Sequence, residues 1–371
     1  MAARVTPGVV AVVADREGVV YEGAFGAMRS SPAVPMRMDA IFRLFSMTKL
    51  VTSLAVMLLV EEGKVDLDGV FADYVPGYRQ PEVLVSFDPS DGSYVTRPAR
   101  TSITVRQLLT HTAGYGYWFL DRPLFQLTDG APELLDPPFL MHAPGERFAY
   151  SSGTDVLGQI FEPVSGLSLD AFFAERIFAP LGMVDTGYEL PADSARLVSV
   201  HARRDGGFEE QALEHKGNAP SGGFGLYSTA RDYIELLRLF LNRGELGARR
   251  LLASERIEDM TRNQIGRLFA ERQTTAFPAR TNDFIFMDGS QKFGFGVMVE
   301  TRDRPTGRSA GSYGWGGILN TYFWVDPKDG IAATVLMQTS PFSDPESVAL
   351  CKRFESAVYG RVGGGAQNRN V

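Results

Sequence analysis

The sequence has a single cysteine, Cys351, and four histidines among its 371 residues. One thiol excludes an intrachain disulfide, and the apolar pattern around Cys351 predicts a buried core residue rather than a catalytic one. The histidines His111, His142, His201 and His215 lack the paired spacing of a metal site. We therefore expect no metal and no other cofactor, and we interpret His111 as a residue that fixes a turn rather than as a catalytic base.

Long apolar runs and an excess of positive charge are also missing. The longest apolar stretch, residues 50–60, is too short to span a bilayer. The chain has 37 Lys and Arg against 44 Asp and Glu, a net charge of −7, whereas nucleic-acid binding needs concentrated positive charge. The first residues do not resemble a secretory signal, because Pro7 and Gly8 interrupt their apolar run. We expect a cytoplasmic protein that acts on a small molecule, with no nucleic-acid or membrane partner; the oligomeric state is not indicated.

Two common catalytic motifs are absent. The chain has no Gly-x-Ser-x-Gly elbow, which argues against an α/β-hydrolase. It also has no glycine-rich loop for binding phosphate.

Strand patterns lie at both ends of the chain and helical patterns lie between them. The N-terminal segment 8–26 has runs at 9–13 and 19–23 on either side of a turn at 15–18, which predicts a β-hairpin. Residues 46–62 are apolar nearly all round, which is typical of a helix at the centre of a protein. Further helices are expected at 104–111, 155–164, 169–178, 231–243 and 347–359, and further strands at 293–300, 317–325 and 331–338.

This order predicts an α/β fold in which both ends of the chain build one antiparallel sheet flanked by helices. We expect residues 1–80 and 215–362 to form this α/β domain and residues 81–214 to form a second, mostly helical lobe. The glycine-rich tail 363–371 is expected to be disordered. Residues 266–290 are rich in phenylalanine without clear periodicity and fit either a flap over the site or a subunit contact.

The first chemical candidate is Ser46-Met-Thr-Lys49. Positions three apart share one helix face, so an amine would lie one turn from a serine hydroxyl and could accept its proton. The N-terminus of the helix adds free N–H groups where an oxyanion would form. A Ser-x-x-Lys also arises by chance about once in a chain of this length at average composition, and a capping serine with a surface lysine is the plainer interpretation of the motif alone.

Two more segments indicate a catalytic site only in combination with the first. Tyr150 stands in a turn before a helix, where it could present its hydroxyl to a site, although an isolated tyrosine there is more often simply packed. Trp315, Gly316 and Gly317 lead into an apolar strand, and the glycines would let a ligand approach the backbone closely. A bulge at the edge of the sheet would use the same residues.

Together these segments resemble the serine β-lactamase-like superfamily, in particular its class C branch and, more closely, the family VIII carboxylesterases. The resemblance runs through nearly the whole chain. It is carried, in order, by Phe42-Arg-Leu-Phe-Ser-Met-Thr-Lys49, Leu108-Leu-Thr-His-Thr-Ala-Gly114, Tyr150-Ser-Ser152, Pro220-Ser-Gly-Gly-Phe-Gly-Leu-Tyr-Ser-Thr229 and Trp315-Gly-Gly317.

The resemblance implies roles for individual residues. Ser46 would be the nucleophile, Lys49 its activating partner, and Tyr150 the acid/base that serves the leaving group and later activates water. The backbone N–H groups of Ser46 and Ile318 would form the oxyanion hole. An acyl-enzyme on Ser46 follows.

Two departures from the family pattern favour an esterase over a lactamase. The third box of lactamases begins with a cation that helps hold the substrate carboxylate, and here that position is Trp315. The second box ends in Ser152, where a lactamase has the asparagine that holds the substrate amide. We therefore expect weak or no lactam hydrolysis.

The loop 114–119 would border the pocket and supply Tyr117 and Trp118 as an apolar substrate site, although packing between the lobes would explain them equally well. With Ser152, Trp315, Gly316 and Gly317 they complete the predicted substrate-binding set. The predicted activity is hydrolysis of small or medium apolar esters. An acyltransferase or amide hydrolase of the same fold is the alternative, and a non-catalytic scaffold or binding protein is the alternative from another class.

Overall fold

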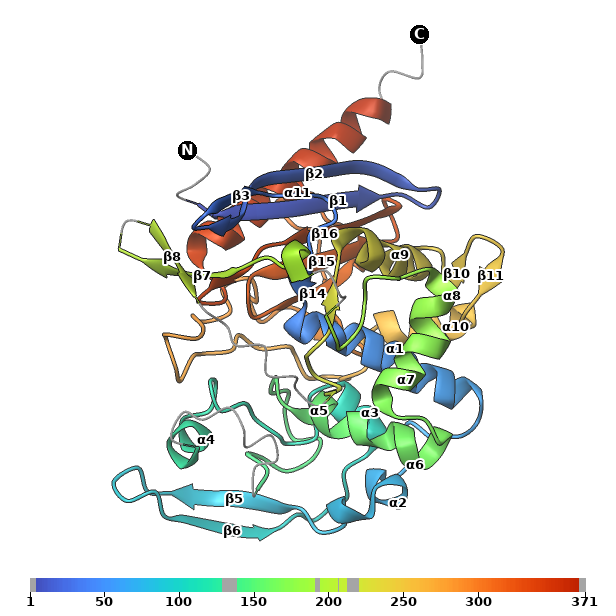
Figure 1. The fold of residues 1–371 in the computed structure, drawn as a ribbon. Helices are drawn as coiled ribbons and strands as arrows, with labels where there is room; N and C mark the ends of the chain where they lie inside the picture. Colours follow the sequence, from blue (N-terminus) through green and yellow to red (C-terminus); the bar gives the residue numbers. More distant parts are fainter. Residues whose placement is uncertain (1–4, 129–138, 191–193, 206, 212–219, 367–371) are drawn as a thin grey trace.

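A central eight-stranded sheet organises the molecule (Figure 1). The structure is a computed structural model and describes residues 5–128, 139–190, 194–205, 207–211 and 220–366. The sheet runs in the order β12-β13-β14-β15-β16-β1-β2-β3, and all its neighbours pair antiparallel. Strands from both ends of the chain therefore meet at the β16–β1 pair, which confirms the predicted fold class.

The strands of the described chain are β1 (Gly8–Ala14), β2 (Val19–Ser30), β3 (Ala33–Pro35), β4 (Phe42–Arg43), β5 (Glu82–Phe87), β6 (Tyr94–Pro98), β7 (Val200–Arg204), β8 (Gly207–Gln211), β9 (Tyr227–Ser228), β10 (Glu245–Leu246), β11 (Arg249–Arg250), β12 (Lys292–Phe293), β13 (Met298–Val299), β14 (Tyr313–Gly317), β15 (Thr321–Asp326), β16 (Ile331–Leu336) and β17 (Thr339–Ser340).

The α-helices are α1 (Thr48–Glu61), α2 (Phe71–Tyr74), α3 (Val105–Leu109), α4 (Arg122–Leu127), α5 (Gly153–Leu157), α6 (Phe161–Ser165), α7 (Leu169–Phe173), α8 (Ala179–Leu181), α9 (Ala230–Leu241), α10 (Ser254–Thr261) and α11 (Pro345–Ala366). A short 3₁₀ helix, η2 (Phe45–Met47), leads directly into α1.

The two faces of the sheet bury different clusters because strand side chains alternate. Val10 and Val12 of β1 point into the main core together with α1 and α9. Ala11 and Val13 point to the other face, where Phe354 and its neighbours on α11 pack against them. The sheet thus lies between a buried helical layer, which carries the candidate nucleophile, and the C-terminal helix (Figure 1).

Helix α1 is buried around most of its circumference, as its composition predicted. All residues from Thr48 to Leu59 are buried, and Gly63 follows the helix in the left-handed conformation with φ 69°. A helix enclosed in this way holds its first turn in a fixed position, so residues 46–49 are set rigidly within the core.

Several predicted boundaries are corrected by the structure. The strand expected at 317–325 is two strands, because β14 ends at Gly317 and the chain turns through Asn320, at φ 59°, into β15. The strand expected at 293–300 is likewise β12 and β13, joined by a tight turn in which Gly294 N–H donates to the Val297 carbonyl. The closing helix was expected to end at Tyr359 and extends to Ala366.

The middle of the chain is less purely helical than expected. It contains the hairpin β5–β6, and β7 pairs in parallel with β17 of the C-terminal part. The expected helix at 155–164 is divided into α5 and α6 by a 3₁₀ turn. The division into two domains at residues 80 and 215 stays a prediction. Residues 367–371 of the tail expected to be disordered lie outside the described residues.

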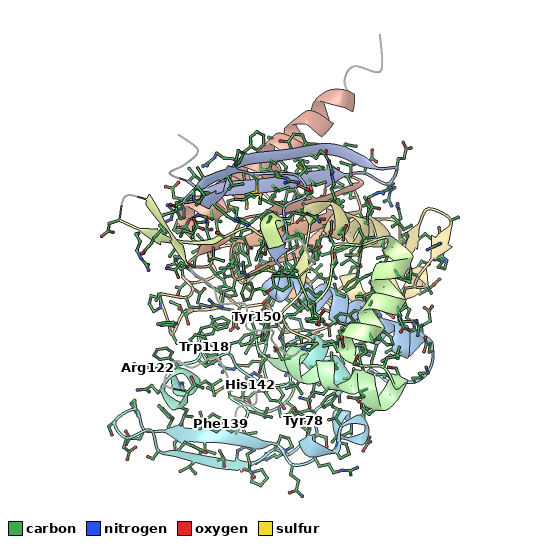
Figure 2. The ribbon with its side chains drawn as sticks, viewed as in Figure 1. Tyr78, Trp118, Arg122, Phe139, His142 and Tyr150 are labelled. Carbon is green, nitrogen blue, oxygen red and sulfur yellow. The ribbon has the colours of Figure 1, made fainter. Side chains whose placement is uncertain are left out.

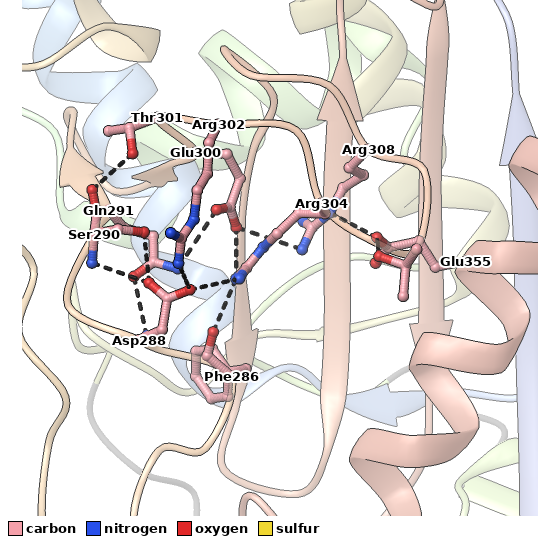
Figure 3. A network of polar contacts seen from close by, with 11 residues as sticks. Phe286, Asp288, Ser290, Gln291, Glu300, Thr301, Arg302, Arg304, Arg308 and Glu355 are labelled. Carbon is pink, nitrogen blue, oxygen red and sulfur yellow. Dashed lines mark hydrogen bonds and ion pairs between the residues drawn. The ribbon is translucent and has the colours of Figure 1, made fainter.

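A charged network ties the segment before β14 to helix α11 (Figure 3). Arg304 contacts Asp288 at 3.1 Å and Glu300 at 2.9 Å, and Arg308 contacts Glu355 of α11 at 3.2 Å. Burial alone would raise the pKa of Asp288, but the hydrogen bonds that Ser290 and Arg302 donate to its carboxylate lower that pKa overall. Burial raises the pKa of Glu300. Each arginine of this network therefore has an acidic partner.

Among the described helices, none is both long and apolar enough to cross a membrane.

Candidate active site

Ser46 lies in η2, at the point where the chain enters α1. The residue before it, Phe45, has a positive φ of 47°, a conformation that is uncommon outside glycine and marks local strain. The chain therefore bends sharply just before the predicted nucleophile. Ser46 itself is only partly buried, so its hydroxyl stays within reach of a substrate while Lys49 beneath it is 1% exposed.

Tyr150 comes from the turn before α5 and meets Ser46 across the core. The two hydroxyl oxygens are 2.6 Å apart, which is hydrogen-bonding distance. The indole Nε1–H of Trp315 points at the same tyrosine oxygen from 3.4 Å, and the two rings pack at 4.9 Å. Trp315 thus contacts the proposed acid/base directly, through an uncharged donor.

The amine of Lys49 has three neighbours. It donates to the Tyr117 hydroxyl at 2.9 Å and to the Gly223 carbonyl at 2.8 Å, and it lies 3.4 Å from the Ser46 hydroxyl. Two acceptors deep in the site therefore hold the nitrogen, and its third direction faces the nucleophile.

These contacts belong to a closed ring of polar groups. The Tyr117 hydroxyl donates to Asp155 at 2.8 Å, so its oxygen is left to accept from Lys49. The other oxygen of Asp155 accepts from the Ser221 hydroxyl at 2.7 Å. Ser221 in turn accepts the N–H of Gly223 at 3.1 Å, and the Gly223 carbonyl returns to Lys49. A fully satisfied buried network of this kind fixes the position of each member.

The pKa values around the ring keep Tyr117 protonated. Burial and the Asp155 carboxylate raise the pKa of Tyr117 well above its usual value. Asp121 accepts the backbone N–H of Tyr117 at 2.9 Å, and burial raises its pKa to about 6. The Tyr117 hydroxyl therefore remains a hydrogen-bond donor through the neutral pH range.

The end of β14 reaches the nucleophile from the side of the sheet. A Cβ atom on Gly317 would lie 2.2 Å from the carbonyl oxygen of Leu44, two residues before Ser46. Only glycine permits this approach. Ile318, the predicted second donor of the oxyanion hole, follows at once, and its backbone is thereby brought to the same end of α1 as Ser46. Gly316 pairs with Tyr322 within the sheet.

His111 holds the segment that carries Tyr150. Its carbonyl accepts the N–H of Ala149 at 2.9 Å, its Nδ1 accepts the N–H of Ser151 at 3.3 Å, and its ring packs on Tyr150 at 4.7 Å. Burial and the nearby Lys49 charge lower the pKa of His111 well below 6.5, so the ring is neutral. His111 therefore lies behind Tyr150. It holds the segment that carries Tyr150, whereas the sequence predicted only that it fixes a turn.

An aromatic wall surrounds this centre. We use this name for Trp118, Phe125, Phe277, Phe284 and Phe286. Trp118 packs on Phe277 at 5.6 Å, and Phe284 lies 6.0 Å from Tyr150 and 6.5 Å from Trp315. Figure 2 shows Trp118 and Tyr150 between the sheet layer and the β5–β6 hairpin.

The segment 266–290 packs against the site. Gln273 accepts the backbone N–H of Tyr150 at 3.1 Å, and Ala276 donates its N–H to the Phe119 carbonyl at 2.9 Å. Of the two interpretations left open by the sequence, cover of the site is the one that these contacts favour.

The remaining predicted binding residues divide into two kinds. Trp118 is partly exposed and belongs to the aromatic wall. Tyr117 and Ser152 are buried, and the Ser152 hydroxyl contacts the Gly116 carbonyl at 3.3 Å. Tyr117 therefore serves the lysine, and Ser152 holds the loop that carries Tyr117.

Sequence reasoning missed three members of the polar ring: Asp155, Ser221 and Gly223. Ser221 and Gly223 lie inside a segment that carries the family resemblance, whereas Asp155 follows such a segment, in the first turn of α5. An acidic residue close to Tyr150 was the available signal. Within the described ranges, no group of three or more His, Cys, Asp or Glu side chains is placed to hold a metal ion.

The sequence is similar to those of known proteins. A family model described as Beta-lactamase matches residues 1–350. Esterase EstB from Burkholderia gladioli is 30% identical over an alignment that covers 95% of this chain and 91% of the relative. Monacolin J acid methylbutanoyltransferase from Aspergillus terreus is 29% identical, with 96% and 92% covered.

A solved structure agrees closely with the fold. Simvastatin synthase from Aspergillus terreus, in a mutant form, superposes with a TM-score of 0.84 at 28% identity, covering 98% of this chain and 92% of that one. The relatives of known activity thus include both an esterase and an acyltransferase on one scaffold.

Proposed function

Because the chain belongs to the Beta-lactamase family, we propose that it is a serine carboxylesterase that cleaves small or medium esters with apolar groups through an acyl-enzyme on Ser46. The observation that carries this proposal is the cluster at the start of α1, where the Ser46 hydroxyl lies 2.6 Å from Tyr150 and 3.4 Å from Lys49. A serine between an amine and a phenol has the partners needed for nucleophilic attack and proton transfer.

In the acylation step, Ser46 Oγ attacks the ester carbonyl carbon and its proton passes to Lys49. The backbone N–H groups of Ser46 and Ile318 stabilise the resulting oxyanion. As the bond to the alcohol breaks, Tyr150 donates its proton to the departing oxygen and is reprotonated from Lys49. The products of this step are the free alcohol and an acyl-enzyme.

In the second step, water attacks the acyl carbon and gives one proton to Lys49 through Tyr150. The bond to Ser46 then breaks, and the proton returns to the serine oxygen as the carboxylic acid leaves. The polar ring behind Lys49 keeps its nitrogen aimed at Ser46 through both steps, since Tyr117 and Gly223 occupy its other contacts.

Trp315 argues for an ester over a lactam. It presents a neutral N–H to Tyr150, at the position where a lactamase would offer a cation. Its ring also packs against Phe284 and Phe286 of the aromatic wall, which suits an uncharged acyl or alcohol group next to the nucleophile.

The test is hydrolysis of 4-nitrophenyl butyrate and of a chromogenic cephalosporin by the wild type and by Ser46→Ala. We expect ester cleavage that falls on the order of 10³-fold or more in the variant, as for other nucleophile deletions, with little cleavage of the cephalosporin by either protein. Fast lactam cleavage would overturn the role given to Trp315, and ester cleavage that survives the substitution would overturn the assignment of Ser46.

Acyl transfer is the second candidate, and the similarity to the methylbutanoyltransferase favours it. The same acyl-enzyme would then be attacked by an alcohol instead of water. The two activities differ only in the acceptor, so product analysis in the presence of an added alcohol separates them.

A further inference from the structure

Among the residues that the structure describes, Arg280 is a cation without an anionic partner, and its guanidinium lies against the ring of Phe45, the residue before Ser46. Its Nε is buried with no hydrogen-bond partner, and among the described residues no carboxylate forms an ion pair with its guanidinium. Neighbouring arginines differ: Arg272 contacts Asp283 at 3.5 Å, and Arg302 contacts Asp288 at 2.8 Å. The acidic side chain closest in sequence, Asp283, is thus engaged by another arginine.

Such an arginine is costly to the folded chain. A buried charge is normally paired or hydrogen-bonded, since desolvation of an unpaired ion is unfavourable. Burial lowers the pKa of Arg280, and no acidic group raises it. Within the described ranges, the favourable contact of its guanidinium is with the ring of Phe45, 5.6 Å from the guanidinium carbon, and a cation–π contact of this kind contributes only modestly to stability.

The backbone of Arg280 is fixed from two sides. Its N–H donates to the Phe277 carbonyl at 3.0 Å, and its own carbonyl accepts the N–H of Phe342 at 3.1 Å. Phe277 and Phe284, on either side of it in sequence, both belong to the aromatic wall. The cation is therefore held in place within the segment that covers the site.

The guanidinium of Arg280 also lies near the residue that precedes Ser46. Phe45, whose ring it contacts, directly precedes Ser46 in the strained bend at the start of α1. Arg280 as a whole keeps some solvent contact although its Nε is buried, so part of this side chain is within reach of a small molecule. Planar guanidinium groups bind carboxylates through paired N–H donors.

We propose that Arg280 binds a carboxylate of the substrate, so that the preferred esters carry one negative charge at the end remote from the scissile bond and an apolar portion against the aromatic wall. This inference rests on the proposed esterase function and deepens it by naming the substrate class. The carboxylate supplies the anionic partner that the described residues do not provide, beside the ring of Phe45.

The experiment compares matched neutral and anionic esters. The first pair places the charge on the acyl group: 4-nitrophenyl butyrate against the mono-4-nitrophenyl ester of glutaric acid. The second pair places it on the leaving group: phenyl acetate against 4-acetoxybenzoate. For each ester, kcat/KM is measured with the wild type, Arg280→Gln, Arg280→Lys and, as the control, Arg272→Gln, which removes an exposed and paired arginine from the same segment.

We expect Arg280→Gln to lower kcat/KM for at least one anionic ester by about tenfold or more, as loss of a charge-assisted contact does, while both neutral esters change by less than about twofold. Arg280→Lys should recover part of the loss, and Arg272→Gln should behave as the wild type. The effect should weaken at high ionic strength, since salt screens a partly exposed pair. A loss that is equal for charged and neutral esters, or no loss with either anionic ester, would overturn the proposal.

Thermal unfolding separates recognition from a structural role. Removal of an unpaired, partly buried charge should leave the melting temperature of Arg280→Gln unchanged or raised, and a clear fall would show that Arg280 supports the fold instead. If the wild type cleaves none of the esters, the proposed function fails, and calorimetric titration with glutarate then decides on Arg280: binding that is lost in Arg280→Gln supports the carboxylate site, and equal or absent binding refutes it.

Discussion

The contacts of Lys49 explain why a buried amine can face a serine in a fixed direction. Two neutral acceptors, the Tyr117 hydroxyl and the Gly223 carbonyl, hold the nitrogen from within the protein. Asp155 orients both acceptors, because it accepts from Tyr117 and from Ser221, whose hydroxyl accepts the Gly223 N–H. Asp155 thus orders the polar ring through Tyr117 and Ser221 and does not pair with Lys49 directly.

Removal of the Tyr117 hydroxyl tests this arrangement. In Tyr117→Phe, Lys49 loses one acceptor and Asp155 loses one donor, so we expect kcat for 4-nitrophenyl butyrate to fall roughly ten- to a hundredfold with little change in KM, a range typical of impaired general acid–base catalysis. Tyr74→Phe is the control, because Tyr74 accepts a backbone N–H of Asp66 away from the site. A rise in KM at constant kcat would instead make Tyr117 a residue that binds substrate.

Asp121 gives the protein a pH-dependent stability. Its pKa of about 6 lies above the usual 3.8, so the native carboxyl holds its proton more tightly than the unfolded one. Its contribution to stability therefore declines as pH rises between these two values, and its full cost is present above about pH 6.

Asp121→Asn removes that titration. We expect the variant to gain stability relative to the wild type at pH about 7.5, on the order of 1–3 kcal/mol in the free energy of unfolding, and much less at pH about 4. Denaturant unfolding at the two pH values measures it. An equal difference at both would mean that Asp121 does not titrate in this window.

At the scale of elements, two glycines let separate segments meet at the nucleophile. Gly317 brings the end of β14 against Leu44, and Gly223 lies so close to Asp155 that a Cβ would be 2.1 Å from its Oδ2. From the sequence we predicted that Gly316 and Gly317 let a ligand approach the backbone, and that strands lie at both ends of the chain. The structure confirms the strands and shows the backbone of Leu44 close to Gly317. The sequence did not show where β14 turns into β15, because Ile318 and Leu319 continue the apolar pattern through the turn and only Asn320 marks it.

Alanine at Gly317 or Gly223 should therefore lower kcat/KM more than alanine at a glycine in a helix away from the site. For Gly317→Ala and Gly223→Ala we expect losses in kcat/KM of about tenfold or more, since displacement of catalytic groups by a fraction of an ångström is costly. Gly360→Ala in α11 meets open space and should retain wild-type activity with unchanged or slightly greater stability. Full activity in both site variants would show that the close approaches are not needed.

The candidate site could be predicted from the sequence only in part. Ser46, Lys49 and Tyr150 belong to a local pattern with a chemical reason, and the structure brings all three together. Asp155 and Arg280 have no such pattern: their importance depends on which groups the fold places near them and, for Arg280, on which groups it does not. That information is spread over segments as distant as Phe45 and Phe342, and only the three-dimensional arrangement reveals it.

For the whole molecule, the open question is what accepts the acyl group. The chain is similar to both an esterase and an acyltransferase, and Ser46 is partly accessible. We expect water to be the main acceptor, so that vinyl butyrate with an equal molar amount of a simple alcohol and excess water yields mostly butyric acid. Chromatographic quantification of acid and new ester measures the partition, and a predominance of the new ester would make the protein a transferase.

The central claim is that Ser46 is the nucleophile, and covalent labelling with a 4-nitrophenyl alkylphosphonate tests it most directly. Attack by Ser46 Oγ releases nitrophenolate and leaves a stable phosphonyl group on the serine. We predict one label per chain, located by peptide mass spectrometry on the peptide that contains Ser46, with none in Ser46→Ala. A label on another residue, or labelling that persists in Ser46→Ala, would show that Ser46 is not the nucleophile.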